Sequence, residues 1–273
     1  MKSFKGQTVL VTGASSGIGE AFSRNLAQRG SNLVLVARSA DKLAHLAKTL
    51  GCQYGVRLFY FPFDLTLDDS PQRLFDEVQA SGLSVDVLIN NAGFGYWGNF
   101  SDGNLQNYKN MVNLNIQAMV SLSYLFLPSM LKRRCGGIIN VGSIVGFQPM
   151  PYGSVYVGSK AFVLHYSESL WGECKRHGVT VTALCPSTTD TNFFNISIPD
   201  QQLREMRMLN MPRSQSPDFV AEVGLNQFLK GKNHVIPGKM NYLMAQGSQL
   251  LLLTARRFAI KVAASFFDPN REK

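Results

Sequence analysis

Tyr156 and Lys160 are the residues of this chain whose types and spacing most directly indicate chemistry. They stand four positions apart in a segment, Val155 to Arg176, whose pattern predicts a helix. Residues four apart on a helix face the same side, so the phenol and the ammonium are expected to be neighbours. A cation close to a phenol should lower the phenol pKa from about 10, so that Tyr156 acts as an acid and base on a reacting oxygen.

Ser143 ends a predicted strand, Gly137 to Val141, just before that helix. Its hydroxyl is placed to hydrogen-bond the same reacting oxygen and to stabilise charge there. A Tyr and a Lys at this spacing are common by chance, but the combination with a Ser at a strand end is much rarer. The three residues together predict chemistry at a carbonyl or alcohol oxygen.

A glycine-rich loop lies near the N-terminus, between a predicted strand, Thr8 to Thr12, and a predicted helix, Ile18 to Arg29. Glycines let a backbone turn tightly and approach a pyrophosphate, which binds at the positive N-terminus of the helix. The spacing is one residue longer than in the commoner GxGxxG fingerprint, and a tight turn without a ligand is the alternative. The candidate dinucleotide-binding residues of the loop are Gly13, Ser15, Ser16, Gly17, Ile18 and Gly19.

Three further segments follow predicted strands and complete this candidate cofactor site. Arg38 follows the second strand, where a carboxylate would bind the ribose hydroxyls and an arginine would bind a 2′-phosphate, so NADP(H) is favoured over NAD. Asp64 follows the third strand and is placed to bind the adenine edge, with a turn-forming role as the alternative. Asn91, Ala92 and Gly93 follow the fourth strand, where small residues let the backbone close on the cofactor.

Apolar runs alternate with amphipathic stretches along the chain, which predicts an α/β fold: a Rossmann-type doubly wound parallel sheet of about seven strands with helices on both faces. We expect one domain over residues 1–273. The remaining predicted strands are Asn32 to Ala37, Val56 to Phe63, Val85 to Asn90, Val179 to Cys185 and His234 to Pro237. The remaining predicted helices are Asp41 to Leu50, Leu74 to Ala80, Leu105 to Arg133 and Pro217 to Leu229.

The net charge of +9 favours anionic partners, although a basic surface without a partner is as compatible with it. No basic stripe with interleaved aromatic residues is present, so we expect no nucleic-acid binding. The four cysteines form no CxxC pair and no His stands at ligand spacing, which predicts no metal site and a cytoplasmic compartment. No stretch reaches the roughly 18 consecutive apolar residues of a spanning helix.

These motifs together resemble the short-chain dehydrogenase/reductase family over residues 7–236. The resemblance implies that Asn115 joins Ser143, Tyr156 and Lys160 as the catalytic set, with Asn113 as the competing assignment. It also implies cofactor contacts by Leu65, Tyr156, Lys160, Pro186 and Thr191, with Lys160 on the ribose hydroxyls. A homodimer or homotetramer formed through the helices that carry Asn115 and Tyr156 is implied as well. Ser187 stands where the family usually has a Gly, so a local difference in this loop is expected.

The resemblance, together with the site residues, predicts an NADP(H)-dependent oxidoreductase that transfers hydride between the nicotinamide and a carbonyl or secondary alcohol. The segment Val36 to Leu43 looks like the branch of the family that reduces oxoacyl, steroid and other apolar carbonyls. A non-catalytic NADP-binding redox sensor is the alternative, against which the intact Ser, Tyr and Lys set argues.

Two segments bear on the substrate and on partners. Residues 187–216 are expected to form a substrate lid and residues 239–273 a helical, apolar and basic tail. The tail is expected to pack on the domain or on a second subunit, with peripheral membrane contact as the alternative. An apolar substrate is indicated by hydrophobic residues of the lid and of the loops facing it: Phe193, Phe194, Ile196, Ile198, Met206, Met208, Met211, Phe94, Tyr96, Trp97, Phe147, Met150 and Tyr152. Arg204, Arg207 and Arg213 could contact an anionic carrier.

Overall fold

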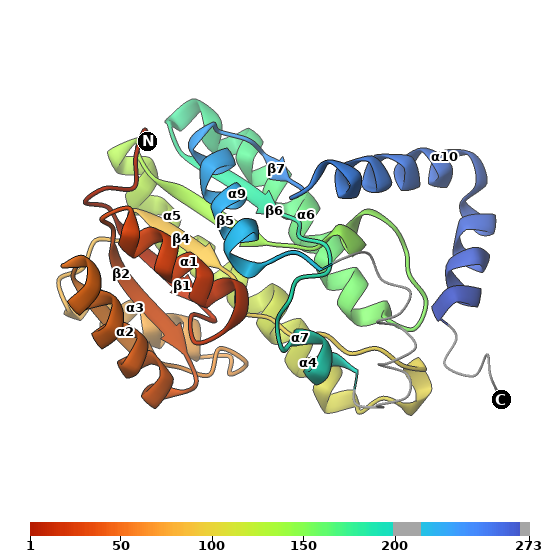
Figure 1. The fold of residues 1–273 in the computed structure, drawn as a ribbon, viewed down its shortest axis with the longest axis horizontal. Coiled ribbons are helices and arrows are strands. Elements are labelled where there is room, and N and C mark those ends of the chain that lie inside the picture. Colours follow the sequence, from red (N-terminus) through yellow and green to blue (C-terminus); the bar gives the residue numbers. More distant parts are fainter. Residues whose placement is uncertain (199–213, 268–273) are drawn as a thin grey trace.

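The computed structural model describes residues 1–198 and 214–267, and its centre is one seven-stranded sheet (Figure 1). All paired strands are parallel, in the order β3-β2-β1-β4-β5-β6-β7, which confirms the predicted fold class. The strands are β1 (Thr8–Thr12), β2 (Asn32–Ala37), β3 (Leu58–Pro62), β4 (Val87–Asn90), β5 (Gly137–Val141), β6 (Thr180–Leu184) and β7 (His234–Val235).

The sheet is buried on both faces, which explains the uninterrupted apolar runs of its central strands. One face packs against α1 (Gly17–Gln28), α2 (Ala40–Tyr54) and α9 (Pro217–Leu229), through side chains such as Phe22, Leu43 and Phe228. The other face packs against α3 (Ser70–Ala80), α5 (Met119–Arg133) and α6 (Ser154–Cys174), through side chains such as Leu74 and Phe126. The strand order changes direction between β3 and β4, because β4 pairs with β1 on the side opposite β2. The glycine loop follows the central strand β1 at this switch point.

The predicted long helix over Leu105 to Arg133 is three connected segments. They are α4 (Leu105–Val112), a π-helical turn η2 (Asn113–Ala118) and α5. Among the described residues this stretch is the one helix long and apolar enough to cross a membrane. Leu122, Phe126 and Met130 of α5 pack on the sheet, however, so its apolar character is that of a core helix.

Two short helical turns were not predicted from the sequence, η1 (Phe100–Asp102) and η3 (Ile144–Phe147). The helix predicted over Val155 to Arg176 is α6 continued by a short turn, η4 (Lys175–His177). Within the expected lid, the structure describes a short helix, α7 (Phe193–Ser197). The methionines Met206, Met208 and Met211 and the arginines Arg204, Arg207 and Arg213 lie outside the described residues. The predicted strands over 56–63, 85–90, 179–185 and 234–237 are each shorter at their ends, and the helix predicted over 41–50 extends to Tyr54.

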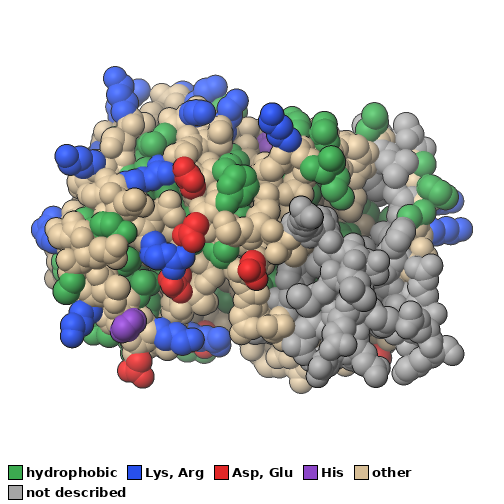
Figure 2. Space-filling view, viewed as in Figure 1, with side chains coloured by type: hydrophobic (Ala, Val, Ile, Leu, Met, Phe, Trp, Pro, Cys, Tyr) green, Lys and Arg blue, Asp and Glu red, His purple; other side chains and the backbone are tan. Residues whose placement is uncertain are grey.

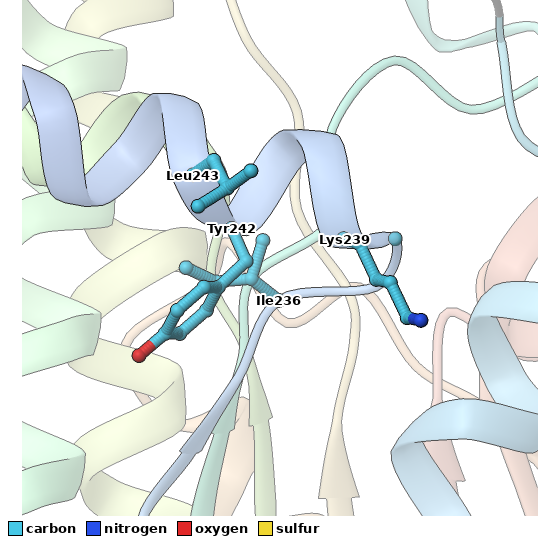
Figure 3. A pocket seen from close by; sticks show the side chains of 5 residues that line it. Ile236, Lys239, Tyr242 and Leu243 are labelled. Carbon is cyan, nitrogen blue, oxygen red and sulfur yellow. The ribbon is translucent and has the colours of Figure 1, made fainter.

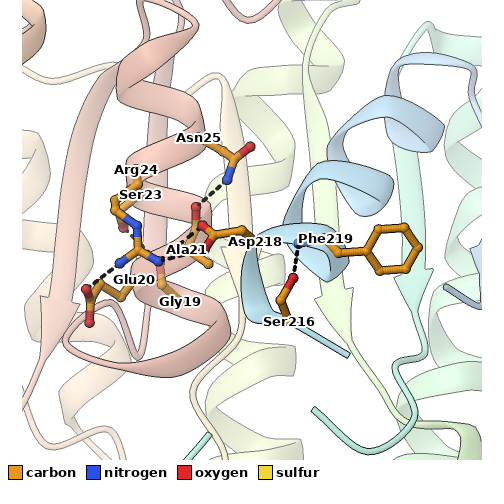
Figure 4. A network of polar contacts seen from close by, with 9 residues as sticks. All are labelled: Gly19, Glu20, Ala21, Ser23, Arg24, Asn25, Ser216, Asp218 and Phe219. Atoms are coloured by element: carbon orange, nitrogen blue, oxygen red, sulfur yellow. Dashed lines mark hydrogen bonds and ion pairs between the residues drawn. The ribbon is translucent and has the colours of Figure 1, made fainter. Parts of the chain in front are cut away.

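Polar contacts link α1 to α9, two neighbouring helices on one face of the sheet (Figure 4). Arg24 of α1 forms ion pairs with Glu20 one turn earlier and with Asp218 at the start of α9, the latter at 3.1 Å. Ser216 caps α9 by accepting a hydrogen bond from the Phe219 amide at 3.2 Å. Figure 4 shows that these side chains bring the N-terminal turn of α9 beside α1, close to the glycine loop.

Helix α10 (Lys239–Phe267) follows β7 and extends away from the rest of the fold (Figure 1). It is kinked at Ala255, whose φ of −143° and ψ of 45° are not helical. Its first turns are attached to the domain by Asn241, which donates to the Pro237 carbonyl oxygen at 2.9 Å, and by Ala245 in a small apolar cluster with Phe147 and Ile236.

Candidate active site

The glycine loop between β1 and α1 is a backbone cradle that side chains would fill. Gly13 and Gly17 have φ of +65° and +56°, in the left-handed region that favours glycine. A Cβ on Gly19 would lie 2.1 Å from the Gly13 carbonyl oxygen. Ser16 precedes α1 without a side-chain cap, so the first amides of the helix have no such partner. This geometry fits a pyrophosphate bound at the helix N-terminus.

Thr12, which the sequence analysis did not select, connects the glycine loop to the segment after β4 by hydrogen bonds. Its hydroxyl oxygen accepts hydrogen bonds from the amides of Asn91 and Ala92, at 2.9 and 3.0 Å, and donates to the Ile89 carbonyl oxygen at 3.3 Å. The Asn91 side-chain amide donates in turn to the carbonyl oxygen of Thr12 at 2.9 Å. The segment after β4 is therefore bonded directly to the loop after β1, and Asn91 has a structural part in the cradle.

Arg38 lies beside this cradle, on the exposed surface just after β2. The Ala14 amide of the loop donates to the Val36 carbonyl oxygen at 3.1 Å, which joins the loop to the end of β2. Within residues 1–198 and 214–267, no carboxylate forms an ion pair with Arg38. The guanidinium is thus available to a phosphate bound next to the loop.

Asp64 and Leu65 follow β3 on the same edge of the sheet. One Asp64 carboxylate oxygen accepts hydrogen bonds from the amide and the hydroxyl of Thr66, at 3.0 and 2.8 Å. This is the turn-forming arrangement that stood as the alternative for Asp64. Leu65 is buried in the core cluster of α3 and α5. Contact of either residue with the adenine stays a prediction.

Tyr156 lies in the first turn of α6 with only 7% of its surface exposed. Burial raises its pKa to about 12, and a hydrogen bond with Ser143 partly opposes this rise. The expectation that the neighbouring lysine lowers this pKa is wrong for the protein without ligands. The physical reason is that desolvation of the phenolate outweighs every other effect on the ring.

Lys160 is buried beside Tyr156, with its ammonium nitrogen 5.8 Å from the centre of the tyrosine ring. The ammonium donates a hydrogen bond to the Val141 carbonyl oxygen at the end of β5, at 2.9 Å. Burial lowers the pKa of Lys160 to about 8, although the nearby Cys185 thiol acts in the opposite direction. The predicted pair of residues is adjacent, but the cation is held by the backbone of the sheet.

Asn115 occupies the π-helical turn η2, where one extra residue is inserted into the helix. Its side chain accepts from the Phe94 amide and donates to the Phe94 carbonyl oxygen and to the Ser159 hydroxyl, at 3.2, 3.0 and 3.0 Å. Asn113, the competing candidate, instead donates to the Thr66 carbonyl oxygen at 3.2 Å. The structure thus places Asn115, and not Asn113, next to the turn of α6 between Tyr156 and Lys160.

Gly93 lies close to both Asn115 and Lys160, where a larger residue would not fit. A Cβ at this position would lie 2.9 Å from the Asn115 side-chain oxygen and 3.6 Å from the Lys160 ammonium nitrogen. The Ser159 hydroxyl, another residue that the sequence analysis missed, donates to the Tyr156 carbonyl oxygen at 2.7 Å. Its position directly before Lys160 on a helix was the available signal, because it faces the turn that carries Tyr156.

The loop after β6 joins the two halves of the site. The Pro186 carbonyl oxygen accepts from the Ile144 amide at 2.9 Å and from the Ser143 hydroxyl at 3.5 Å. A Cβ on Gly17 would meet the Thr191 methyl group at 3.0 Å, so Thr191 lies against the glycine loop. Ser187 does not have a positive φ, which explains why the loop tolerates a serine at this position.

Aromatic side chains cover Tyr156 on the side away from the sheet. The ring centres of Phe193 in α7 and of Trp97 lie 5.5 and 6.0 Å from that of Tyr156. The predicted residues Phe94, Tyr96, Met150 and Ile198 belong to the same cluster. Phe147 packs elsewhere, against Leu164, Ile236 and Ala245, because it follows Ser143 toward β7. The candidate site therefore has a polar floor and an apolar wall.

Within the described ranges no group of three or more His, Cys, Asp and Glu side chains could hold a metal ion. The family model described as short chain dehydrogenase matches residues 7–202. The chain belongs to this family. The family's oxidoreductases act on carbonyl and alcohol groups, which confirms the predicted enzyme class.

Individual members of the short-chain dehydrogenase family resemble this chain over most of its length. The very-long-chain 3-oxoacyl-CoA reductase of Mus musculus is 32% identical over 250 residues, which cover 88% of this chain and 76% of the mouse protein. A short-chain dehydrogenase from Sphingobium yanoikuyae, solved in complex with NADPH, has a TM-score of 0.78 at 30% identity, covering 91% of this chain and 96% of its own. A bulky-bulky ketone specific alcohol dehydrogenase from Comamonas testosteroni has a TM-score of 0.75 at 29% identity, covering 91% and 94%.

Proposed function

We propose that this protein reduces an apolar ketone or oxoacyl compound with NADPH, or catalyses the reverse oxidation. The observation that carries the proposal is the position of the Tyr156 hydroxyl, which is hydrogen-bonded to Ser143 and covered by Phe193 and Trp97. A polar floor under an apolar wall suits a carbonyl group on a hydrophobic body. The mouse relative named as acting on very-long-chain 3-oxoacyl-CoA and the Comamonas ketone-specific structure support the same class.

When bound, NADPH supplies the hydride. Tyr156 donates its proton to the oxygen of the carbonyl as charge develops there, and Ser143 hydrogen-bonds the same oxygen. The elevated pKa of Tyr156 keeps the phenol protonated and ready to donate. Lys160, fixed by the Val141 carbonyl oxygen, places positive charge beside the ring and stabilises the phenolate that forms.

Asn115 holds the turn between Tyr156 and Lys160 through Ser159. Its bonds to both the amide and the carbonyl oxygen of Phe94 fix the segment after β4 at the same time. These contacts support the role that the family resemblance implies for Asn115, which is to order a proton relay to Lys160. A redox sensor without turnover would have no need of this protonation machinery.

Preference for NADPH over NADH is part of the proposal and rests on Arg38. The exposed Arg38 guanidinium, which forms no ion pair within residues 1–198 and 214–267, is suited to a 2′-phosphate, and the residue before it, Ala37, offers no carboxylate to the ribose. The Sphingobium structure was solved with NADPH, which supports the same preference.

We also propose that the enzyme forms a homodimer through α5 and α6. Tyr124 on α5 is 77% exposed, and Phe162 on α6 is also exposed and stacks on Tyr166. These side chains lie on the faces of the two helices away from the sheet. Light scattering of Tyr124→Asp is expected to show a monomer, whereas a wild-type protein that is itself monomeric would exclude this interface.

The substrate is tested with a series of ketones and 3-oxoacyl thioesters of increasing chain length. Each methylene buried against the apolar wall should contribute up to about 0.8 kcal/mol, so kcat/KM should climb about threefold to fourfold per carbon before levelling. Phe193→Ala should flatten the series, while Phe219→Ala, at an exposed phenylalanine of α9, should leave it unchanged. A series that is flat in the wild type would contradict the apolar substrate.

A further inference from the structure

Helix α10 presents several large apolar side chains to solvent, although its first turns are joined to a packed domain. Among the described residues, fourteen large hydrophobic side chains are exposed, and seven of them lie on α10. These seven are Met240, Tyr242, Leu243, Met244, Leu250, Phe258 and Val262, which we call the α10 apolar face. Figure 2 shows hydrophobic side chains on the edge of the molecule where Figure 1 places α10.

In the first turns of α10, the side of the helix that faces the domain is not its most apolar side. The residues that face the domain are Asn241 and Ala245, one polar and one small. Met240, Leu243, Met244 and Leu250 point away from it, at spacings of three, four and seven that share one side of a helix. Among the described residues, the amphipathic pattern of these turns is therefore directed away from the domain.

A groove at the base of α10 continues the α10 apolar face. It has a volume of about 470 Å³ and is lined by Ile236, Gly238, Lys239, Tyr242 and Leu243. Figure 3 shows the Tyr242 ring beside Ile236, with the Lys239 side chain directed to the other side. Tyr242 and Leu243 thus belong both to the groove and to the exposed face, so the concave and convex surfaces form one apolar area.

The charge of α10 identifies the kind of partner. The helix carries four cations, Lys239, Arg256, Arg257 and Lys261, and no acidic residue. Arg257 and Lys261 are exposed one turn apart, beside Phe258 and Val262. Cations next to an exposed apolar face match an anionic lipid surface, where apolar side chains enter the acyl boundary and Lys and Arg reach the headgroups. Two copies of this helix placed face to face would instead bring like charges together.

We propose that α10 is an interfacial helix that binds the protein to the surface of an anionic membrane. The helix lies in the plane of the headgroups, with the α10 apolar face directed into the bilayer and its cations on anionic lipid. The domain stays in water, because its two main apolar clusters are buried between the sheet and the helices α1, α2, α3, α5, α6 and α9. The kink at Ala255 divides the helix into two segments that bind the surface.

Sedimentation with vesicles tests the proposal on the full chain. Wild type should pellet with an equal mixture of phosphatidylcholine and phosphatidylglycerol and much less with phosphatidylcholine alone. Raising the salt from 0.1 to 1 M shortens the screening length from about 10 to about 3 Å and should release several-fold more protein. Wild type that stays in the supernatant with both vesicles, or binds both equally and independently of salt, would overturn the proposal.

Matched variants separate the apolar and the ionic parts. Leu250→Asp should weaken vesicle binding about tenfold or more, while Leu105→Asp, at an equally exposed leucine of α4, should leave it unchanged. Lys261→Glu should weaken binding to the mixed vesicles, unlike Lys48→Glu on α2. Light scattering of the same proteins addresses a second copy as the partner. A dimer that Leu250→Asp converts to a monomer, without vesicle binding by the wild type, would assign the face to subunit contact and overturn the membrane proposal.

Discussion

The Lys160 ammonium lies 5.8 Å from the centre of the Tyr156 ring, and its hydrogen bond goes to the main chain of β5. The cation is therefore fixed independently of the tyrosine and acts on it through space. The buried phenol therefore stays protonated until negative charge develops on the substrate oxygen. The cation then stabilises the phenolate that remains after the proton is transferred.

Tyr156→Phe should lower kcat by about 10²- to 10⁴-fold, because the substitution removes the proton donor and leaves the glycine loop unchanged. NADPH affinity, measured by fluorescence titration, should stay within a few-fold of wild type. Tyr166→Phe on the same helix is the control and should retain activity. A Tyr156→Phe enzyme within tenfold of wild-type turnover would remove the tyrosine from the mechanism.

Lys160→Met should change the pH dependence of stability. The unfolded chain holds the Lys160 proton up to its ordinary pKa of 10.5, whereas the folded protein releases it near about 8. Between these values the unfolded state binds more protons, so the wild-type free energy of unfolding gains from this residue as pH rises. Below pH 8 the buried cation destabilises the fold by a constant amount.

Denaturant unfolding at several pH values checks this expectation. Lys160→Met should be more stable than wild type at pH 7, and the difference should shrink between pH 8 and 10. Lys48→Met, at an exposed lysine of α2, should show a difference that does not vary with pH. A gap between Lys160→Met and wild type that is equal at pH 7 and 10 would contradict the depressed pKa.

Cofactor preference should follow the residues after β2. Replacing Ala37 by Asp and Arg38 by Ala should shift the preference toward NADH, because the charge-assisted contact that is lost is worth about 1.5–3 kcal/mol, or tenfold or more in affinity. Arg57→Ala, at an exposed arginine before β3, is the control. Competitive binding of the two cofactors measures the ratio, and a wild type that binds both equally would refute the role of Arg38.

Gly19→Ala should disable the cradle. Its Cβ would collide with the Gly13 carbonyl oxygen at 2.1 Å, so the loop must open or the helix must shift. NADPH affinity should fall at least tenfold, by titration. Gly172→Ala is the matched control, because a Cβ there meets no atom within 4 Å, and this helical substitution should stabilise the protein by about 0.5–1 kcal/mol. Unchanged NADPH affinity in Gly19→Ala would show that the loop does not hold the cofactor.

The sheet could be predicted from the sequence because each central strand, such as Val9 to Val11 and Leu33 to Val36, is an apolar run between turn residues. The glycine loop, and the proximity of Tyr156 to Lys160, could also be predicted, because each depends on the spacing of residues within one short segment. The π-helical turn at Asn115 could not, because it interrupts an otherwise regular periodic pattern without a proline or glycine. It depends on contacts with Phe94 and Ser159, which come from distant parts of the chain.

The pKa of Tyr156 and the orientation of α10 were also beyond sequence reasoning. The first depends on how completely Phe193 and Trp97 exclude water from the ring, which no spacing rule gives. The second depends on the rotation of one helix about its axis. The same residues of α10 would form an ordinary buried stripe if Asn241 and Ala245 were on the outside.

The position of β1 in the middle of the sheet has a consequence for how the chain is made. β1 pairs with β2 on one side and with β4 on the other, and β4 ends only at Asn90. A growing polypeptide can therefore join its first three strands early, yet must present an unpaired apolar strand until the ribosome has released the fourth. If translation stops after β3 but before β4, the edge of β1 that pairs with β4 stays exposed and prone to aggregation. Chaperone binding to nascent chains should be greatest in that interval.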